Sequence, residues 1–410
     1  MRTPGCRCRH PRPRQFPFFT CANAPDRTSR KLTMSQISAL IQKVAPFGAS
    51  RWEPTCFGDA PRIPIIGRDD VVRLFDHIDL WDCWPLAHED GRTVQHLGRS
   101  WWFFLSAPVF ADPVERHGHA RIRLLSIGDG GWIDHGNAFP DGMTPGSREW
   151  AGSAVLMDDG VTVHHFFTAA GRRGEQAMTF EQRIFSSVGR LGDAGPGQWQ
   201  EPREILIADG VRYVYDRQDA GAPGLIKGFR DPAWLRDPAT GLAHLLFTGS
   251  AAWTDHAFNG NVGMATLMEG EWKLGDPLIE ATGVNNELER PHVIVRDGHY
   301  YLFWSTQTHT FAPGAVAGPN ALYGMVADSL AGPWRPINGT SLVAANPDAE
   351  AKQSYSWWVT GEGVVWSFVD YWGMEGRTTA ECPALLRSNF GGTPAPRFSL
   401  NFDGDSVTIA

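Results

Sequence analysis

From about Trp52 onward, short apolar runs alternate with turns, and no long helical pattern follows residue 80. Three pairs of runs flank an Asp-Gly step, within residues 154–167, 205–215 and 292–304. An Asp-Gly step matches the twist of paired strands, so each pair predicts a β-hairpin. Many short strands joined by regular turns indicate a sandwich, a barrel or a propeller. About 350 residues without a Gly/Ser-rich linker favour one propeller of four-stranded blades.

The first 33 residues differ from the rest of the chain in charge. They hold eight Lys or Arg and one acid, so the remaining chain has a balance of −15 within a total of −8. Their one apolar run, residues 16–19, is too short for a secretory signal and contains a Pro. We expect residues 1–33 to be a basic, disordered extension or a mis-assigned start before Met34. Residues 35–44 predict an amphipathic helix with a Ser cap. Residues 34–50 would then lead into a single domain at residues 51–410.

Composition excludes several classes of protein. With 42 % hydrophobic and 20 % charged residues the chain is globular rather than disordered. No apolar run reaches the roughly 18 residues of a membrane span, and the acidic balance argues against a nucleic-acid partner. Six Cys cannot form a disulfide scaffold, and the closely spaced Cys6 and Cys8 lack the second ligand pair that a zinc site needs. We expect neither a metal nor a cofactor.

Three acidic residues have unusual neighbours. Asp82 lies between tryptophans, Asp231 between Arg and Pro, and Glu289 before Arg-Pro. An Asp before Pro usually caps a turn, and Trp-rich segments are usually core, so each motif alone has a structural explanation. Together they suit retaining glycoside transfer, which needs an ionised carboxylate nucleophile and a protonated carboxyl acid. Aromatic surroundings raise the pKa of one carboxyl, and a neighbouring Arg keeps another ionised.

Five motifs in this order resemble glycoside hydrolase family 68, the levansucrases, inulosucrases and related β-fructofuranosidases, over about residues 50–375. The motifs are Trp81-Asp82-Cys83-Trp84-Pro85-Leu86, Glu149-Trp150-Ala151-Gly152-Ser153-Ala154, Phe229-Arg230-Asp231-Pro232, Glu287-Leu288-Glu289-Arg290-Pro291 and Tyr355-Ser356. The resemblance implies an all-β, five-bladed β-propeller with a funnel-shaped central pocket. It also implies sucrose as donor, a sugar acceptor and a covalent fructosyl-enzyme. Family members are often exported, which favours an extracellular or periplasmic location, while a cytoplasmic one stays open.

The resemblance assigns roles residue by residue. Asp82 is expected to be the nucleophile, Glu289 the general acid and base, and Asp231 the stabiliser of the transition state. Residues expected to hold the sugars or to support the acid are Trp81, Trp150, Arg230, Glu287, Arg290 and Tyr355.

Three positions depart from the family pattern. Ala151 replaces a Ser whose hydroxyl orients the nucleophile, so that orientation must come from elsewhere. Gln307 stands where many members carry Arg or His on the acceptor side; a shorter, neutral side chain favours short products over long polymer. His309, two residues on, is an alternative for this role. Asn286 replaces the Asp of calcium-binding members, so we expect no structural calcium.

Other interpretations were weighed on single features. Glu381 precedes Cys-Pro, as in the acid/base motif of the related family 32, but the chain lacks that family's opening motif and added sandwich. We interpret Cys83 as a packing residue. A mainly hydrolytic β-fructofuranosidase and a non-catalytic sugar-binding propeller remain alternatives. A protein-interaction propeller would show repeats of roughly 40–45 residues, and none is visible.

Overall fold

The structure is a computed structural model that describes residues 46–58, 61–215 and 220–410. Short β-strands make up nearly all the regular structure in these residues. The largest sheet has ten strands: β2 (Ile78–His88), β3 (Gln95–His96), β4 (Arg99–Pro108), β5 (Arg121–Gly128), β6 (Gly131–Asn137), β7 (Arg148–Leu156), β8 (Thr162–Ala170), β9 (Gln182–Gly192), β10 (Gly195–Gly197) and β11 (Arg203–Leu206). A parallel pairing of β2 with β7 joins its two antiparallel halves.

Three smaller sheets complete the described part of the chain. The first contains β1 (Ser50–Arg51), β12 (Phe229–Arg236), β13 (Ala243–Ser250), β14 (Gly260–Met268), β15 (Glu271–Leu274) and β16 (Ile279–Glu280). The second contains β17 (Glu289–Arg296), β18 (His299–Thr306), β19 (Ala321–Ala327), β20 (Arg335–Pro336) and β21 (Leu342–Ala345). The third contains β22 (Ser354–Val359), β23 (Val364–Tyr371), β24 (Phe390–Pro394), β25 (Phe398–Asp403) and β26 (Ser406–Ile409).

Helical structure in the described residues is limited to 3₁₀ turns. They are η1 (Pro46–Gly48), η2 (Arg68–Asp70), η3 (Pro113–His119), η4 (Thr308–Thr310), η5 (Ile337–Gly339), η6 (Asp348–Glu350) and η7 (Pro383–Leu385). None of the helices in this part of the chain is long and apolar enough to cross a membrane. The predictions for residues 1–33 and for a helix at residues 35–44 lie outside the described residues.

Two of the three predicted hairpins are confirmed. β7 pairs with β8, and β17 pairs with β18. The turn between β17 and β18 is formed by Asp297 and Gly298, which both have positive φ. The hairpin at residues 205–215 is wrong, because β11 pairs with β9 and residues 211–215 form no strand. The Asp209 carboxylate accepts hydrogen bonds from the backbone N–H groups of residues 211, 212 and 213, which removes donors from a ladder.

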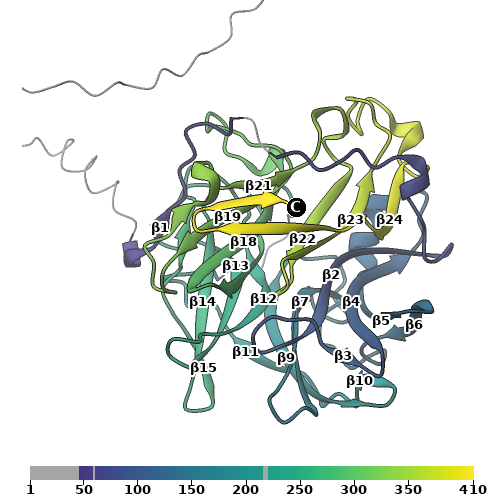
Figure 1. The fold of residues 1–410 in the computed structure, drawn as a ribbon, viewed down its shortest axis with the longest axis horizontal. Helices are drawn as coiled ribbons and strands as arrows, with labels where there is room; N and C mark the ends of the chain where they lie inside the picture. The colour runs from purple at the N-terminus through teal and green to yellow at the C-terminus, as the bar shows by residue number, and fades with distance from the viewer. Residues whose placement is uncertain (1–45, 59–60, 216–219) are drawn as a thin grey trace, which may run out of the picture. The chain divides into compact units, whose positions relative to one another are not determined.

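Five strands form a closed ring in the interior. β2 contacts β7, and the contacts continue through β12, β17 and β22 back to β2. Figure 1 labels β2, β7, β12 and β22 close together in the middle of the ribbon. A cavity inside the ring is lined by side chains from all five strands, among them Pro85, Ser153, Trp234, His292 and Trp358. The ring therefore brings one end of each strand toward a common centre.

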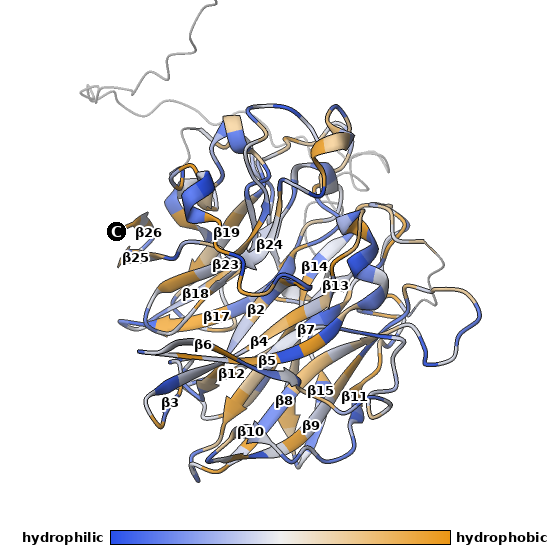
Figure 2. Ribbon diagram, turned by 90° about the vertical axis from the view of Figure 1, so that its right-hand side faces the viewer, coloured by the Kyte–Doolittle hydropathy of each residue, from blue (hydrophilic) through white to orange (hydrophobic). Residues whose placement is uncertain are grey.

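Apolar side chains pack between the sheets. Figure 2 shows hydrophobic colour along the strands and hydrophilic colour on many connecting loops. The largest core cluster joins residues from most of the chain, including Trp84, Phe103, Phe167, Phe303 and Trp357. Since these residues are far apart in sequence, the core fixes the strand ends that carry the polar groups described next.

Candidate active site

Each strand of the ring has a β-bulge near its first residues, and the predicted site residues lie at these bulges. The ladder registers shift at Trp81-Asp82 on β2, Trp150-Ala151 on β7, Arg230-Asp231 on β12, Glu289-Arg290 on β17 and Tyr355-Ser356 on β22. Four bulge residues have positive φ: Asp82 (42°), Asp231 (61°), Arg290 (53°) and Ser356 (60°). This conformation costs a non-glycine residue about 1 kcal/mol or more, and such strain is typical of functional sites. The bulges aim polar side chains toward the ring centre.

Arg230 of β12 binds two carboxylates at the start of β17 and lies close to a third on its own strand. Its Nη2 atom donates to Glu287 Oε2 at 2.8 Å and to Glu289 Oε1 at 2.9 Å. Its Nε atom lies 3.5 Å from Asp231 Oδ2. The side chain is 5 % exposed, so these three carboxylates interact with it in a region of low dielectric constant.

Asp82 receives a hydrogen bond from the Ser356 hydroxyl, which also accepts from Arg290 Nη1 at 2.7 Å. Arg290 donates further to the backbone carbonyls of Ser356 and Cys83. Burial raises the pKa of Asp82, while Arg290 and Ser356 oppose the shift. A hydroxyl from β22 thus lies against Asp82, where Ala151 of β7 offers none, and the side-chain hydrogen bonds of Arg290 lie on the Asp82 side of the site.

Two further carboxyls of the cluster have raised pKa values. Burial raises the pKa of Asp231 to about 6 against the opposing charge of Arg230. Burial likewise raises the pKa of Glu287 to about 7, with Arg230 opposing and Glu289 adding to the shift. A hydrogen bond joins the carboxyl groups of Glu287 and Glu289. Glu287 therefore retains a proton near neutral pH, within hydrogen-bond reach of Glu289.

The remaining predicted residues lie around these carboxyls. The Tyr355 hydroxyl donates to Glu289 Oε2, and the Asn286 amide donates to Glu287 Oε1 at 2.9 Å. Trp81 is 3 % exposed and directly precedes Asp82, and Trp150 is partly exposed at the equivalent position of β7. These aromatic residues provide apolar surface next to the charged cluster.

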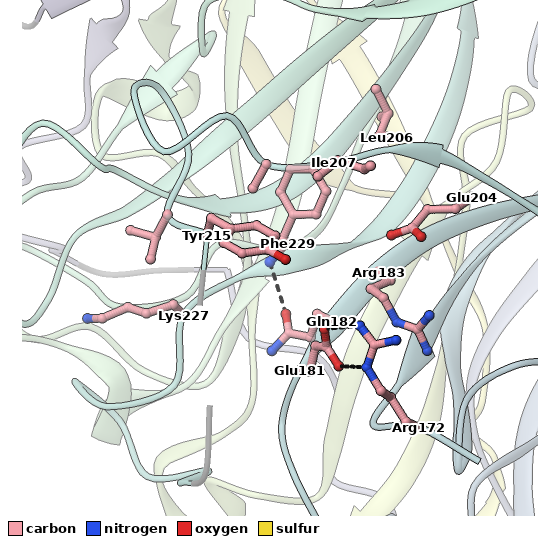
Figure 3. Close-up of a pocket in the computed structure, with 12 residues that line it drawn as sticks. Arg172, Glu181, Gln182, Arg183, Glu204, Leu206, Ile207, Tyr215, Lys227 and Phe229 are labelled. Carbon is pink, nitrogen blue, oxygen red and sulfur yellow. Dashed lines mark hydrogen bonds and ion pairs between the residues drawn. The ribbon is translucent and has the colours of Figure 1, made fainter. Parts of the chain in front are cut away.

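The start of β12 is positioned by a buried amide. Gln182 Oε1 accepts a hydrogen bond from the Phe229 backbone N–H at 2.9 Å and lies 3.4 Å from Arg230 Nη1. Figure 3 shows this contact at the edge of a pocket where Arg172 forms a bidentate ion pair with Glu181. Gln182 therefore fixes the backbone from which Arg230 and Asp231 project.

Gln307 follows β18 at the same end of its sheet, since Glu289 pairs with Ser305. No described hydrogen bond joins the Gln307 side chain to the catalytic carboxyls. His309 lies within electrostatic range of Glu289 and Lys352; burial lowers its pKa, with Lys352 adding to the shift. A neutral imidazole next to the acid can exchange hydrogen bonds with sugar hydroxyls.

Several supporting residues carry no local sequence signal. The Thr248 hydroxyl donates to Asp231 Oδ2 at 3.1 Å, and the Asp231 backbone N–H donates to Thr168 Oγ1 at 2.9 Å. Ser356 was part of a motif, but its bond to Asp82 depends on the meeting of β2 and β22. A lone Thr or Gln in a strand has no distinguishing pattern, so only the fold reveals these contacts.

Glu381 and Cys83 lie in environments that indicate no catalytic role. Glu381 is exposed and bonds to Thr378, away from any described contact with the cluster. Cys83 is buried, and burial raises the pKa of its thiol to about 12, which leaves it protonated. Within the described residues no group of three or more His, Cys, Asp or Glu could hold a metal ion.

The fold and the bulge-mounted carboxylates define a carbohydrate-active enzyme, and comparison with known proteins agrees. The chain matches the family model "Levansucrase/Invertase" over residues 26–265 and 256–410. It is 32 % identical over 350 residues to a levansucrase of Rahnella aquatilis, covering 75 % of this chain and 82 % of that one. It is 31 % identical over 379 residues to a levansucrase of Erwinia amylovora, covering 82 % and 87 %. The chain belongs to glycoside hydrolase family 68.

Solved structures give the same result for the fold. The inulosucrase of Halalkalicoccus jeotgali bound to kestose superposes with a TM-score of 0.80 at 39 % identity, covering 88 % of this chain and 95 % of that one. The levansucrase of Gluconacetobacter diazotrophicus has a TM-score of 0.72 at 24 % identity, covering 88 % and 90 %. The all-β fold is therefore that of the family's β-propellers.

Proposed function

We propose that the protein is a retaining fructosyltransferase that cleaves sucrose, releases glucose and passes fructose to a sugar acceptor or to water. The observation that carries this proposal is the convergence of Asp82, Asp231 and Glu289 on one ring centre, with Arg230 and Arg290 between them. Membership of the family supports sucrose as donor, since its named relatives include levansucrases and an inulosucrase.

In the first step the Asp82 carboxylate attacks the anomeric carbon of the fructosyl unit, and the bond to the glucosyl oxygen breaks. The Ser356 hydroxyl orients the attacking carboxylate. Glu289 gives a proton to the departing oxygen and receives it from Glu287, which retains a proton near neutral pH and is hydrogen-bonded to Glu289. Asp231, ionised above its raised pKa, stabilises the positive charge that develops on the sugar ring.

In the second step Glu289 acts as a base on the acceptor hydroxyl, which attacks the anomeric carbon and frees Asp82. Arg230 holds Glu289 and Glu287 in place through both steps. Retention of configuration follows because two displacements occur at the same carbon.

Incubation with sucrose, with glucose and free fructose measured separately, tests this function. Glucose reports cleavage, free fructose reports hydrolysis, and a deficit of fructose reports transfer. Glu289→Gln is expected to remove most glucose release, and the exposed Glu381→Gln is the matched control. Denaturation during turnover should leave fructose on a peptide that contains Asp82 and not on one that contains Asp231. A wild-type protein that releases no glucose contradicts the proposal.

We also infer that residues 51–410 form a five-bladed propeller with a funnel-shaped central pocket. The five contacting inner strands and the cavity that all five line support this count. The parallel pairing of β2 with β7 would merge two blades into the ten-stranded sheet. An experimental structure with sucrose bound to an Asp82→Asn variant tests the count. We further propose that residues 1–33 are dispensable, so their removal should leave sucrose cleavage unchanged.

We infer that free fructose and short oligosaccharides exceed high-molecular-weight fructan among the products. Gln307 offers neutral hydrogen bonds to an acceptor, whereas a charged side chain would bind a long chain more strongly. Neutral His309 adds a second weak contact. Size-exclusion analysis of products from concentrated sucrose measures the distribution, and Gln307→Arg should shift it toward longer chains. Polymer as the main wild-type product overturns this inference.

A further inference from the structure

Beside the strand of the nucleophile lies a buried arginine that the mechanism above does not use. Arg116 of η3 is 6 % exposed, and its guanidinium lies 4.5 Å from the centre of the Phe390 ring and 5.4 Å from that of Trp81. Its Nη1 atom donates to the Pro113 carbonyl at 2.8 Å. Its Nε atom is buried and has no hydrogen-bond partner.

A nearby carboxylate, Asp370, also has a buried polar atom without a hydrogen-bond partner. The atom is Oδ1, and the residue lies on β23. Burial raises the pKa of Asp370 to about 6; Arg116 and Lys352 oppose the shift, and Asp82 adds to it. Arg116 also acts on Asp82. Tyr371, the residue after Asp370, pairs with Phe390, and Arg116 lies over the Phe390 ring. Arg116 and Asp370 therefore lie near each other on the Asp82 side of the ring of strands.

Two buried polar atoms of opposite character, both unpartnered, do not satisfy each other. Each unpaired atom destabilises the fold unless a ligand completes its hydrogen bonding. A sugar hydroxyl suits both, because one oxygen accepts from a guanidinium while its hydrogen is donated to a carboxylate. A purely anionic or cationic ligand group would satisfy only one of them.

We propose that Arg116 and Asp370 bind one hydroxyl group of the fructosyl unit held at Asp82. Arg116 donates to the hydroxyl oxygen, and the hydroxyl donates to Asp370. The fructosyl side is indicated because Arg116 stacks over Trp81, the neighbour of Asp82, whereas His309 and Gln307 lie on the side of Glu289. This inference rests on the proposed function and adds two substrate-binding residues to it.

The test separates binding from turnover by measuring sucrose affinity calorimetrically in an Asp82→Asn background. Adding Asp370→Asn is expected to weaken sucrose binding about 10- to 100-fold, as the loss of a hydrogen bond to a charged group predicts. Arg116→Lys, which keeps the charge but lacks Nε, is expected to weaken it by a similar factor. Glu381→Gln on the same background is the control and should leave affinity unchanged. In the otherwise wild-type protein, Asp370→Asn should raise KM for sucrose.

Each outcome has a distinct consequence. Unchanged sucrose affinity in a folded Asp370→Asn or Arg116→Lys variant overturns the proposed binding of a hydroxyl by Arg116 and Asp370. The proposed function stays intact in that case. The opposite outcome is sucrose binding that depends on both residues, in a wild-type protein that never releases glucose. It would support the binding of a hydroxyl by Arg116 and Asp370 and refute the proposed function. If Asp370→Asn fails to fold, Arg116→Lys still decides, because its charge and most of its packing are kept.

Discussion

Strand β2 carries two carboxylates three residues apart whose surroundings differ sharply. Asp79 is fully buried and accepts hydrogen bonds from Arg73 Nη1 at 3.0 Å and from both Nη atoms of Arg387, at 2.7 and 3.1 Å. Asp82 has a single hydroxyl donor, Ser356, and no ion pair among the described contacts. It also lies at a bulge with positive φ, whereas Asp79 lies in regular pairing opposite Ala107.

The difference shows how one strand serves both stability and chemistry. Two arginines satisfy the Asp79 carboxylate and connect β2 to segments before it and near the C-terminus. Three accepted hydrogen bonds occupy most of the acceptor sites of this carboxylate, and its complete burial keeps it from a substrate. Asp82 is held less completely, so burial is not fully offset and the pKa rises. Incomplete pairing at a strained position is typical of a reactive group.

The largest expected effect is the loss of sucrose cleavage on substitution of Asp82, the carboxylate with fewer hydrogen-bond partners. Asp82→Asn should lower sucrose cleavage at least ~10³-fold, because the amide cannot form the fructosyl ester. The melting temperature should stay the same or rise, since a strained, partly desolvated charge is removed. Glucose release and thermal unfolding measured on one preparation check both statements. Turnover near the wild-type value would sink the assignment of the nucleophile.

The paired position should behave in the opposite way. Asp79→Asn leaves two arginines without their counter-charge, which is expected to cost about 3–5 kcal/mol of unfolding free energy. The folded fraction should keep a nearly wild-type KM for sucrose, because Asp79 does not face the sugar. Urea unfolding and initial rates in the folded baseline test this. If stability is unchanged while kcat collapses, the structural role given to Asp79 is wrong.

A third prediction asks whether the donor to Asp82 can be moved to another strand. Ser356→Ala removes the hydroxyl that orients the carboxylate and should lower kcat roughly 10- to 100-fold. Ala151→Ser, at the equivalent bulge of β7, should recover part of this loss in the double variant. The kcat values of the wild-type protein, the two single variants and the double variant form a double-mutant cycle. A Ser356→Ala protein with wild-type kcat would show that Asp82 needs no donor.

Local patterns were enough to select the candidate residues that the fold brings together, because each motif is contiguous. Asp82, Asp231 and Glu289 lie within separate short motifs, and the structure brings them to equivalent bulges. Two Asp-Gly hairpins were also predicted, since the turn residues determine them locally. The hairpin at residues 205–215 failed because the Asp209 side chain captures backbone N–H groups that a ladder would use.

Contacts between distant strands could not be predicted in this way. Ser356 reaches Asp82 only because β22 closes the ring against β2. Arg116 and Asp370 lie in unremarkable segments, and their relation to Trp81 arises from the packing of η3 and β23. The pairing of Asp79 with Arg387 spans more than 300 residues and has no sequence pattern. Ring closure, rather than any motif, creates these interactions.

The fourth prediction uses the raised pKa values of the catalytic cluster. Asp231 and Glu287 have folded-state pKa values of about 6 and about 7, above the values of an unfolded chain. Their protonation therefore stabilises the fold, fully at low pH, and this stability is lost as pH rises through 6 to 7. Between pH 8 and pH 5 the sugar-free protein should gain about 4 kcal/mol from these groups, roughly a third of it from Asp231. Asp231→Asn should therefore remove about a third of this gain, and a profile left unchanged by Asp231→Asn would contradict the raised pKa of Asp231.

The same pKa values predict the activity profile. Because Asp231 must be ionised to stabilise the sugar cation, kcat/KM should fall as pH drops through about 6. Because Glu287 must hold its proton to pass it on, kcat/KM should also fall above about 7. A profile that is flat from pH 5 to pH 8 would contradict both assignments.

The smallest expected effect is that of removing divalent cations. Both carboxylates on β2 and those of the catalytic cluster interact with arginines or hydroxyls, so a cation is not needed to balance them. At the position where the family resemblance implies Asp in calcium-binding members, Asn286 is neutral and its amide N–H donates to Glu287, so the charged oxygen that a hard cation prefers is absent there. EDTA should therefore change neither the melting temperature by more than about 1 °C nor the rate of glucose release, and added calcium should restore nothing. Asn286→Asp is the informative variant, because it replaces that donor with a carboxylate beside Glu287 and should make stability respond to calcium for the first time. A drop of several degrees in the wild-type protein on chelation would mean that a cation, and not arginine alone, balances these carboxylates.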